Sequence, residues 1–230
     1  MSVLVLFLLL PLMPLGADSF MSRVHWSYSG SIFIFAANNG KQGADPSAVL
    51  PSLGLSAAYP VWGPLRLELT HDLYFTNYEY NAELEYPMAC NPENRSAFVM
   101  GILTGFQLTG LFPVSTSGLN VRVFAGPAVD FRIVVLAFGL NHPDDFTGNI
   151  ETDAQLQTDA IRRYFWSKGR WLLPTAGAGI DFPINEKFYL GLDLRVWFPL
   201  YRAWTDDHLP KVDGWRFGAG FRITSRKKGE

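Results

Sequence analysis

Apolar and polar residues alternate with a period of two along much of the chain. In LRLELTHDLY, residues 65–74, leucines occupy positions 65, 67, 69 and 73, and charged or polar residues occupy every even position. Such alternation predicts a β-strand with one face in an apolar environment. Eight segments show it, each near the length of a tilted membrane-spanning strand. They cover residues 24–36, 48–60, 65–77, 96–110, 119–134, 171–182, 188–202 and 214–224.

The connections between these segments alternate between short and long. Short, turn-like connections follow the second, fourth and sixth segments, and longer ones follow the first, third, fifth and seventh. This layout predicts an all-β fold, an eight-stranded antiparallel up-and-down transmembrane β-barrel with short periplasmic turns and long extracellular loops. In the longest loop, acidic residues precede basic ones, which predicts a short helix within residues 151–166.

The charged residues on the polar strand faces indicate which face is inside. All lysines fall in connections or the C-terminal tail, whereas the strands carry arginines and carboxylates in near balance. A solvated face would be rich in Lys and Glu, while arginine suits buried, bidentate ion pairs. We therefore expect the apolar face to contact lipid and the polar face to line a narrow lumen. The predicted lumen charge network comprises Arg66, Glu68, Asp72, Arg122, Asp130, Arg132, Asp181, Asp193, Arg195, Arg216 and Arg222.

Glycines and aromatic residues support the same orientation. Many strand glycines share the polar face, where a narrow interior must leave room for bulky side chains. Aromatic residues cluster toward both ends of the segments, as in the interfacial girdles of membrane barrels. The predicted girdle at the short turns contains Tyr59, Trp62, Phe182 and Phe188, and that at the long loops contains Tyr74, Trp171, Tyr201, Trp204 and Trp215.

The amino-acid composition limits the classes of protein to which this chain can belong. The 230 residues are 48% hydrophobic and 15% aromatic but only 17% charged, so the chain needs an apolar environment. The net charge of −2 gives no indication of a nucleic-acid partner. A soluble secreted barrel of the lipocalin type is the alternative, but it does not account for two aromatic bands.

The sequence at the two ends of the chain predicts a division into a signal peptide, a barrel and a tail. Residues 1–17, MSVLVLFLLLPLMPLGA, have an apolar core followed by small residues and resemble a cleaved signal peptide, although no Lys or Arg precedes the core. Residues 18–224 would form the outer-membrane barrel, and residues 225–230 a basic periplasmic tail. The single cysteine, Cys90, is interpreted as an unpaired loop thiol.

Enzymatic motifs are absent from the sequence. It contains neither GxSxG nor HExxH, and the adjacent His71 and Asp72 should point to opposite faces of a strand. His208, beside Asp206 and Asp207, is the best acid/base or metal candidate, but a solvated acidic loop explains it as well. We therefore expect no enzyme activity, no bound metal and no cofactor. A lipid-modifying barrel enzyme is the less favoured alternative.

The strand number, loop alternation and charged lumen resemble the small eight-stranded outer-membrane proteins, the group of the OmpA transmembrane domain, OmpX and OmpW. The last strand, WRFGAGFRIT, is similar to the aromatic signal recognised by barrel-assembly machinery, carried here by Phe217, Phe221 and Ile223. It departs from the usual pattern because the chain continues through SRKKGE. The resemblance implies outer-membrane lipid and the assembly machinery as partners.

Two functions follow from this resemblance. OmpW-like members imply a porin that passes small solutes, and OmpX-like or OmpA-like members imply a plugged barrel with a structural or adhesive role. The charged lumen favours the plugged type, while inward Phe33, Phe35, Phe124 and Leu173 add apolar patches. The sequence thus predicts an integral outer-membrane barrel with a narrow, charged lumen. Passage of small solutes is its more specific expected function, and environmental ligands would bind at the exposed loops.

Overall fold

A computed structural model of the chain describes residues 22–35, 48–82, 85–90, 95–114, 118–136, 148–151, 153–205 and 214–226. Most of the described chain is β-strand, and a single antiparallel sheet contains every strand. The strands are β1 (His25–Phe35), β2 (Ala48–Trp62), β3 (Leu65–Asn81), β4 (Tyr86–Ala89), β5 (Ala97–Pro113), β6 (Asn120–Gly126), β7 (Ala128–Leu136), β8 (Thr175–Pro183), β9 (Phe188–Trp197) and β10 (Arg216–Ser225).

Strands β6 and β7 are two parts of one barrel strand. Both pair with β5 in the same register, with Ala125 opposite Leu108 and Ala128 opposite Gly105. Pro127 separates them because proline has no N–H to offer to the ladder. Its carbonyl still accepts a hydrogen bond from the Phe106 N–H at 2.9 Å. The predicted fifth strand is therefore confirmed as one strand with a proline interruption.

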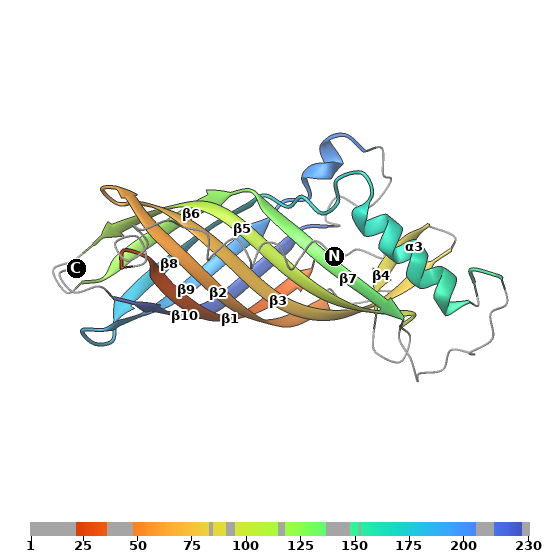
Figure 1. Cartoon of the computed structure of the whole chain (residues 1–230), viewed down its shortest axis with the longest axis horizontal. Helices are drawn as coiled ribbons and strands as arrows, with labels where there is room; N and C mark the ends of the chain where they lie inside the picture. The colour runs from red at the N-terminus through yellow and green to blue at the C-terminus, as the bar shows by residue number, and fades with distance from the viewer. Residues whose placement is uncertain are drawn as a thin grey trace.

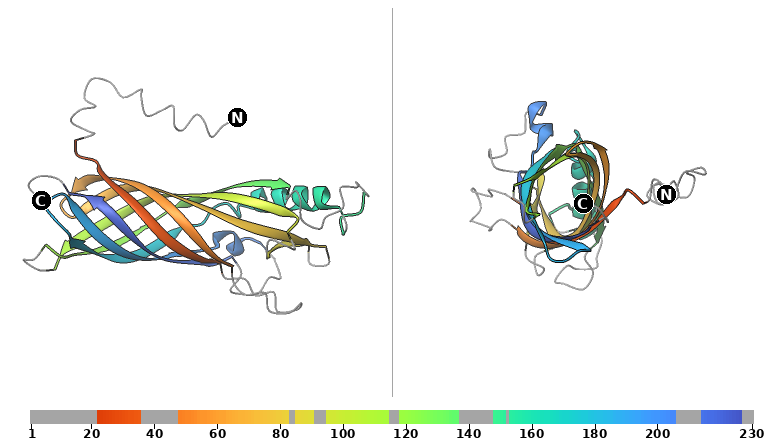
Figure 2. Two further views of the ribbon diagram at one scale, coloured as in Figure 1. Left: turned by 90° about the horizontal axis from the view of Figure 1, so that it is seen from below. Right: turned by 90° about the vertical axis from the view of Figure 1, so that its left-hand side faces the viewer.

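The sheet closes into a barrel. Around the ring, β1 pairs with β2, β2 with β3, β3 with β5, β5 with β6 and β7, β6 with β8, β8 with β9, and β9 with β10, and β10 returns to pair with β1. Side chains reinforce this last seam: the hydroxyls of Ser27 and Thr224 lie 2.8 Å apart, and the Trp26 N–H donates to Ser225 at 3.0 Å. The end-on view in Figure 2 shows the closed ring. The predicted closed, eight-stranded antiparallel barrel is confirmed.

Two predicted strands are shorter at one end by four or more residues, whereas β3 and β5 extend beyond their predicted ends at residues 77 and 110. The sixth begins at Thr175 rather than at residue 171, because Trp171–Pro174 form a turn with one isolated bridge from Leu172 to Val129. The seventh ends at Trp197 rather than at residue 202. Pro199 follows and cannot donate to a ladder, and the chain turns into the 3-10 helix η3 (Leu200–Ala203). Strand β4, which pairs with the end of β3, was not predicted.

The helix expected within residues 151–166 is confirmed as α3 (Ala154–Trp166). The Asp153 carboxylate caps it by accepting hydrogen bonds from the N–H groups of Gln155 and Leu156 at 3.0 and 3.2 Å. Buried Ile161 and Phe165 pack against the extended ends of β3, β5 and β7. Figure 1 shows α3 and β4 together at the long-loop end of the barrel. In the described part of the chain, no helix is both long and apolar enough to cross a membrane.

The alternation seen in the sequence separates the two faces of the barrel. On β3, Glu68 and Asp72 are buried inside, whereas Leu67 is exposed outside. Exposed apolar side chains come from all around the barrel, and include Ile32, Leu53, Leu67, Phe106, Leu108, Val123, Ile133, Ile180, Leu192, Leu194, Phe217 and Phe221. A continuous apolar belt of this kind is unusual for a protein surface in water. It matches the lipid-facing surface of a transmembrane barrel.

Candidate functional site: the barrel lumen

Glu68 is the centre of a buried ion cluster in the half of the lumen near the short turns. Its carboxylate accepts hydrogen bonds from the hydroxyls of Ser56 and Thr109, both at 2.9 Å. The guanidinium groups of Arg122 and Arg222 lie 3.0 and 3.4 Å away. Glu68 is only 1% exposed, so these four donors replace the water that the charge has lost.

Three further carboxylates complete this cluster. Arg195 donates to Asp72 at 2.9 Å and lies 3.4 Å from Asp193, which also pairs with Arg122. The Nη2 atom of Arg222 lies 2.9 Å from both carboxylate oxygens of Asp181. The turn-side ion cluster, as we call this group, consists of Glu68, Asp72, Arg122, Asp181, Asp193, Arg195 and Arg222. It joins strands that are up to 154 residues apart in the chain.

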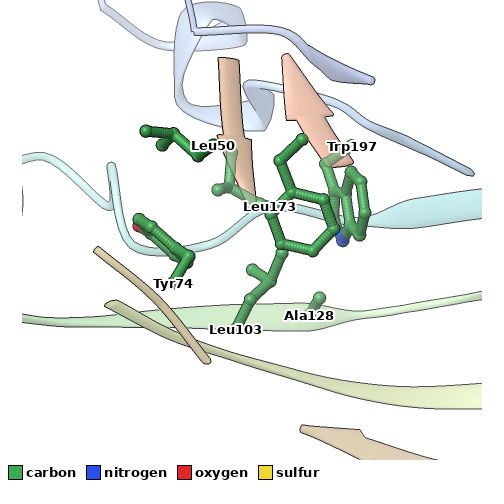
Figure 3. Close-up of a cluster of buried hydrophobic side chains, with 7 residues drawn as sticks. Leu50, Tyr74, Leu103, Ala128, Leu173 and Trp197 are labelled. Atoms are coloured by element: carbon green, nitrogen blue, oxygen red, sulfur yellow. The ribbon is translucent and has the colours of Figure 1, made fainter. Parts of the chain in front are cut away.

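An apolar layer fills the lumen on the long-loop side of these charges. Phe33 packs edge to face against Trp197, with ring centroids 5.0 Å apart, and lies 6.2 Å from the ring of Tyr74. Figure 3 shows the side chains converging from several strands and from the turn before β8. The layer consists of Phe33, Leu50, Tyr74, Leu103, Ala128, Leu173 and Trp197. Water is excluded because all of these side chains are buried.

A second, smaller ion cluster lies beside this layer and consists of Asp130, Arg132 and Arg216. Asp130 pairs with both arginines and accepts hydrogen bonds from the Tyr74 hydroxyl at 2.9 and 3.0 Å. The Arg132 guanidinium also stacks over the ring of Phe165 on α3, 4.1 Å from its centroid. This loop-side ion cluster therefore connects the barrel interior to the helix that covers its end.

Glycines provide the space for these bulky groups. A Cβ atom on Gly101 would overlap the ring of Tyr74, and one on Gly177 would overlap Phe124. In the charged half, a Cβ on Gly54 would meet Asp72, and one on Gly179 would meet Asp193. The prediction that polar-face glycines make room for large inward side chains is thus confirmed by the packing.

Among the described residues, a pocket of about 20 Å³ lies at the short-turn end of the lumen, lined by His25, Arg66, Tyr189 and other polar side chains. That volume is sufficient for about one water molecule. Arg66 is half-buried at this pocket, and the other ten predicted network residues form the ion pairs described above.

The predicted girdle residues fall into three groups by exposure. Trp62, Phe182, Phe188 and Trp204 are exposed, and Tyr59, Trp171 and Trp215 are half-buried. Tyr74 and Tyr201 are buried, so their assignment to a lipid-facing girdle was wrong. Tyr74 has the same strand parity as Glu68 and points into the lumen, and Tyr201 packs near Arg170 and Gly214. Membrane contact of the other girdle residues stays a prediction.

Other sequence candidates do not assemble into a catalytic site. Asp72 points into the lumen while His71 contacts Thr104 on the outer face, as expected from their adjacent positions. His25 lines the small pocket, and Cys90 is half-buried. Within the described residues, no group of three or more His, Cys, Asp or Glu side chains could hold a metal. Three predicted features lie outside the described residues: the predicted signal peptide at residues 1–17, His208 with Asp206 and Asp207, and residues 227–230 of the predicted tail.

No protein-family model matches the sequence, and no curated protein matches it significantly. Solved structures are similar in fold. Neisserial surface protein A is 12% identical with a TM-score of 0.50, and the match covers 89% of this chain and 97% of that protein. OprG from Pseudomonas aeruginosa is 11% identical with a TM-score of 0.47, covering 88% and 96%. Ail, the attachment invasion locus protein of Yersinia pestis, is 9% identical with a TM-score of 0.42, covering 88% and 94%.

At these identities the similarity concerns the fold and does not identify an activity. The match to Neisserial surface protein A extends over nearly the whole of both chains, as expected if the barrels have the same strand number and order. The chain therefore has the fold of the small eight-stranded outer-membrane β-barrel proteins.

Proposed function

We propose that this chain is an outer-membrane barrel with a closed lumen, which presents a folded surface at its long-loop end. The apolar outer belt and the fold support the membrane location. The contents of the lumen support closure. A structural or adhesive role then suits the molecule better than the passage of solutes, and no catalytic role is proposed.

The observation that carries this proposal is the filling of the lumen by two different kinds of packing. A hydrated ion would have to displace the arginine–carboxylate pairs of the turn-side ion cluster. It would next meet the apolar layer, in which Phe33, Leu103 and Trp197 are at most 2% exposed. Separating buried ion pairs and hydrating an apolar constriction are both costly, so the native lumen should not conduct.

The loop end supports a role in surface presentation. Strands β3, β5 and β7 continue past the ring, and α3 packs on them through Ile161 and Phe165. Thr158 of α3 donates to the Ser96 carbonyl at 2.9 Å, and Arg162 donates to the Val134 carbonyl at 3.1 Å. These contacts hold the helix in a defined place, so an external ligand would meet a preorganised surface.

Conductance of the purified, folded protein in planar lipid bilayers tests closure. We expect no discrete channel events under conditions in which an open porin conducts. The folded state is checked first by the shift in electrophoretic mobility on heating. Stable, reproducible conductance from folded protein would overturn the closed-lumen proposal and would favour the passage of small solutes.

A pair of variants makes this test sharper. Trp197→Ala together with Phe33→Ala removes two of the three aromatic side chains of the apolar layer and should allow water and brief leak currents. Leu194→Ala is the matched control, because Leu194 lies on the same strand as Trp197 but is 68% exposed outside. If the luminal and the external truncations gave the same current as the parent protein, the apolar layer would not be the barrier.

Location is tested in cells that express the full chain. The protein should fractionate with outer membranes, resist extraction by alkali or urea, and require detergent for solubility. Protein that stayed soluble without detergent would exclude the membrane-barrel assignment. N-terminal sequencing of the same mature protein would test cleavage near residue 17, which stays a prediction.

A further inference from the structure

His71 and Thr104 form a polar pair within the apolar outer belt. They are directly opposite each other on β3 and β5, and the His71 Nδ1 atom lies 3.0 Å from the Thr104 hydroxyl oxygen. The neighbouring outward residues on both strands are apolar, with Leu69 and Leu73 beside His71 and Ile102 and Phe106 beside Thr104. An ionisable side chain in a lipid-facing row of leucines needs a physical explanation.

The pair lies near the middle of the belt. On β3 the outward row begins at Leu65 and becomes polar at Asn77, so His71 is six residues from each end. At about 3.3 Å per residue and a tilt of about 40°, six residues correspond to roughly 15 Å along the barrel axis. That is half of a hydrocarbon core about 30 Å thick. Lipid headgroups and bulk water are therefore out of reach.

The pair offers one hydrogen-bond donor and one acceptor, whichever tautomer the imidazole adopts. If Nε2 carries the proton, the Thr104 hydroxyl donates to Nδ1, which leaves the Nε2–H as a donor and the Thr104 oxygen as an acceptor. If Nδ1 carries the proton, it donates to Thr104, so Nε2 is the acceptor and the hydroxyl is the donor. In the described part of the chain, the Thr104 contact is the only hydrogen bond of this imidazole.

A patch with one donor and one acceptor is complementary to its own copy. In a dimer with two-fold symmetry, residue i of one subunit meets residue j of the other, and j meets i in return. His71 of each subunit could then bond to Thr104 of its partner, giving two equivalent hydrogen bonds and leaving no polar atom in contact with lipid. Acyl chains offer no such partner, and a buried unpaired polar group is costly.

We propose that the β3–β5 outer face, centred on His71 and Thr104, is the contact surface of a homodimer within the membrane. The surrounding side chains would pack against their copies, among them Leu55, which is opposite His71 on β2. This inference depends on the membrane location of the barrel but not on closure of its lumen. Association and conductance are measured separately, so either proposal can fail without the other.

The first test measures association of the full chain in proteoliposomes, by energy transfer between two fluorescent labels over a range of protein-to-lipid ratios. The parent protein should show concentration-dependent dimers. His71→Leu and Thr104→Val keep a similar shape but remove the polar atoms, and each should raise the Kd about ten-fold, the effect of two average membrane hydrogen bonds. A monomeric parent, or variants that associate like the parent, would overturn the proposal.

Mixing the two variants tests whether His71 of each subunit bonds to Thr104 of the other. A His71→Leu subunit keeps Thr104, and a Thr104→Val subunit keeps His71, so their heterodimer can form one of the two hydrogen bonds. Neither homodimer can form any His71–Thr104 bond between subunits. We expect more energy transfer in the mixture than in either variant alone. Equal transfer in all three samples would exclude the reciprocal contact.

Cross-linking locates the surface independently. With Cys90 replaced by serine, a new cysteine in place of Leu73 should cross-link two subunits through a short bifunctional reagent, because it is next to His71 on the outer face. A cysteine in place of Leu194 on β9 is the control, since β9 is across the barrel from β3 and β5 in the strand order. Preferential cross-linking through position 194 would place the interface elsewhere and reject this face. Heat-dependent mobility confirms that each variant is folded.

Discussion

The two halves of the lumen are filled by different kinds of side chain. Toward the short turns, arginines and carboxylates fill the space and satisfy one another, as Glu68 shows with its four donors. Toward the long loops, aromatic and aliphatic side chains fill it, with Phe33 and Trp197 in direct ring contact. Strand alternation is the same in both halves, and glycine makes room in both.

This difference shows that the alternation along a strand determines which side chains point into the lumen, but not whether those side chains are charged or apolar. The charged half is held by partners that must all be present, because each lost partner leaves a buried charge. The apolar half is held by shape, so its tolerance depends on volume. The two halves should therefore respond differently to substitutions, and unfolding by urea in lipid vesicles can measure the difference.

The largest effect is expected for Glu68→Ala in the charged half. The substitution leaves Arg122 and Arg222 without their shared carboxylate and removes the acceptor of Ser56 and Thr109. The free energy of unfolding should fall by about 3–5 kcal/mol. Membrane insertion should persist, because the outer face is unchanged.

A double variant separates the loss of charge from the loss of a partner. Glu68→Leu with Arg122→Met removes one charge of each sign, so the net charge of the turn-side ion cluster is unchanged. Replacing a buried pair by apolar residues is often nearly neutral, so the double variant should be clearly more stable than Glu68→Ala. If both lost the same stability, the ion pairs would not explain the effect.

The outer face of the same strand gives the next largest effect. Leu69 follows Glu68 but faces lipid near the middle of the belt, and Leu69→Arg should cost about 2–4 kcal/mol. Leu69→Met is the control for size and should cost less than about 1.5 kcal/mol. A tolerated arginine at position 69 would mean that this outer face is in contact with water rather than lipid, and would contradict the membrane location.

In the apolar half, Gly101→Ala tests packing by shape. The new Cβ would overlap the Tyr74 ring, which is held by its hydrogen bonds to Asp130. We expect a loss of about 1–3 kcal/mol in the free energy of unfolding, as for other overpacked sites. Combining it with Tyr74→Leu should give less than the sum of the two losses, because the smaller side chain relieves the overlap. Strict additivity would contradict the proposed contact.

The smallest effect is expected outside the lumen, at the pair of Asp159 and Arg162 on α3. Their atoms lie 2.8 Å apart, but both side chains are well exposed. Asp159→Ala should change stability by no more than about 0.5 kcal/mol, and added salt should reduce even that. A loss comparable to that of Glu68→Ala would show that burial does not explain the contrast between the two halves of the lumen.

Local alternation was enough to predict the barrel and the direction of most side chains. Because the period of a strand is two residues, Glu68, Asp72 and the leucines of the same strand could be assigned to faces without knowledge of the neighbouring strands. The lumen charge network followed from the same parity and from the choice of arginine over lysine. Tyr74 could have been predicted in the same way, but it was assigned by its nearness to a long loop rather than by its even position.

The remaining features depend on contacts that are distant in the sequence. The partners of Arg222 are on β3 and β8, and no spacing along the chain indicates this pairing. Strand β4 was missed because its four residues are too few for a periodic signal. Pro199 was the sequence signal for the early end of β9, whereas the turn before β8 depends on hydrogen bonds to the carbonyls of Ala128 and Gly169. Tertiary contacts decide where such strands begin.

The seam between β1 and β10 has a consequence for the order of folding. Ser27 and Thr224 meet across 197 residues of sequence, so the barrel cannot close before its final strand has been synthesised. Such distant pairing is slow because a long loop must be closed first. Until then β1 and β10 expose unpaired edges that can join other chains. We therefore expect the newly made chain to be most prone to aggregation during the time in which β1 and β10 are not yet paired.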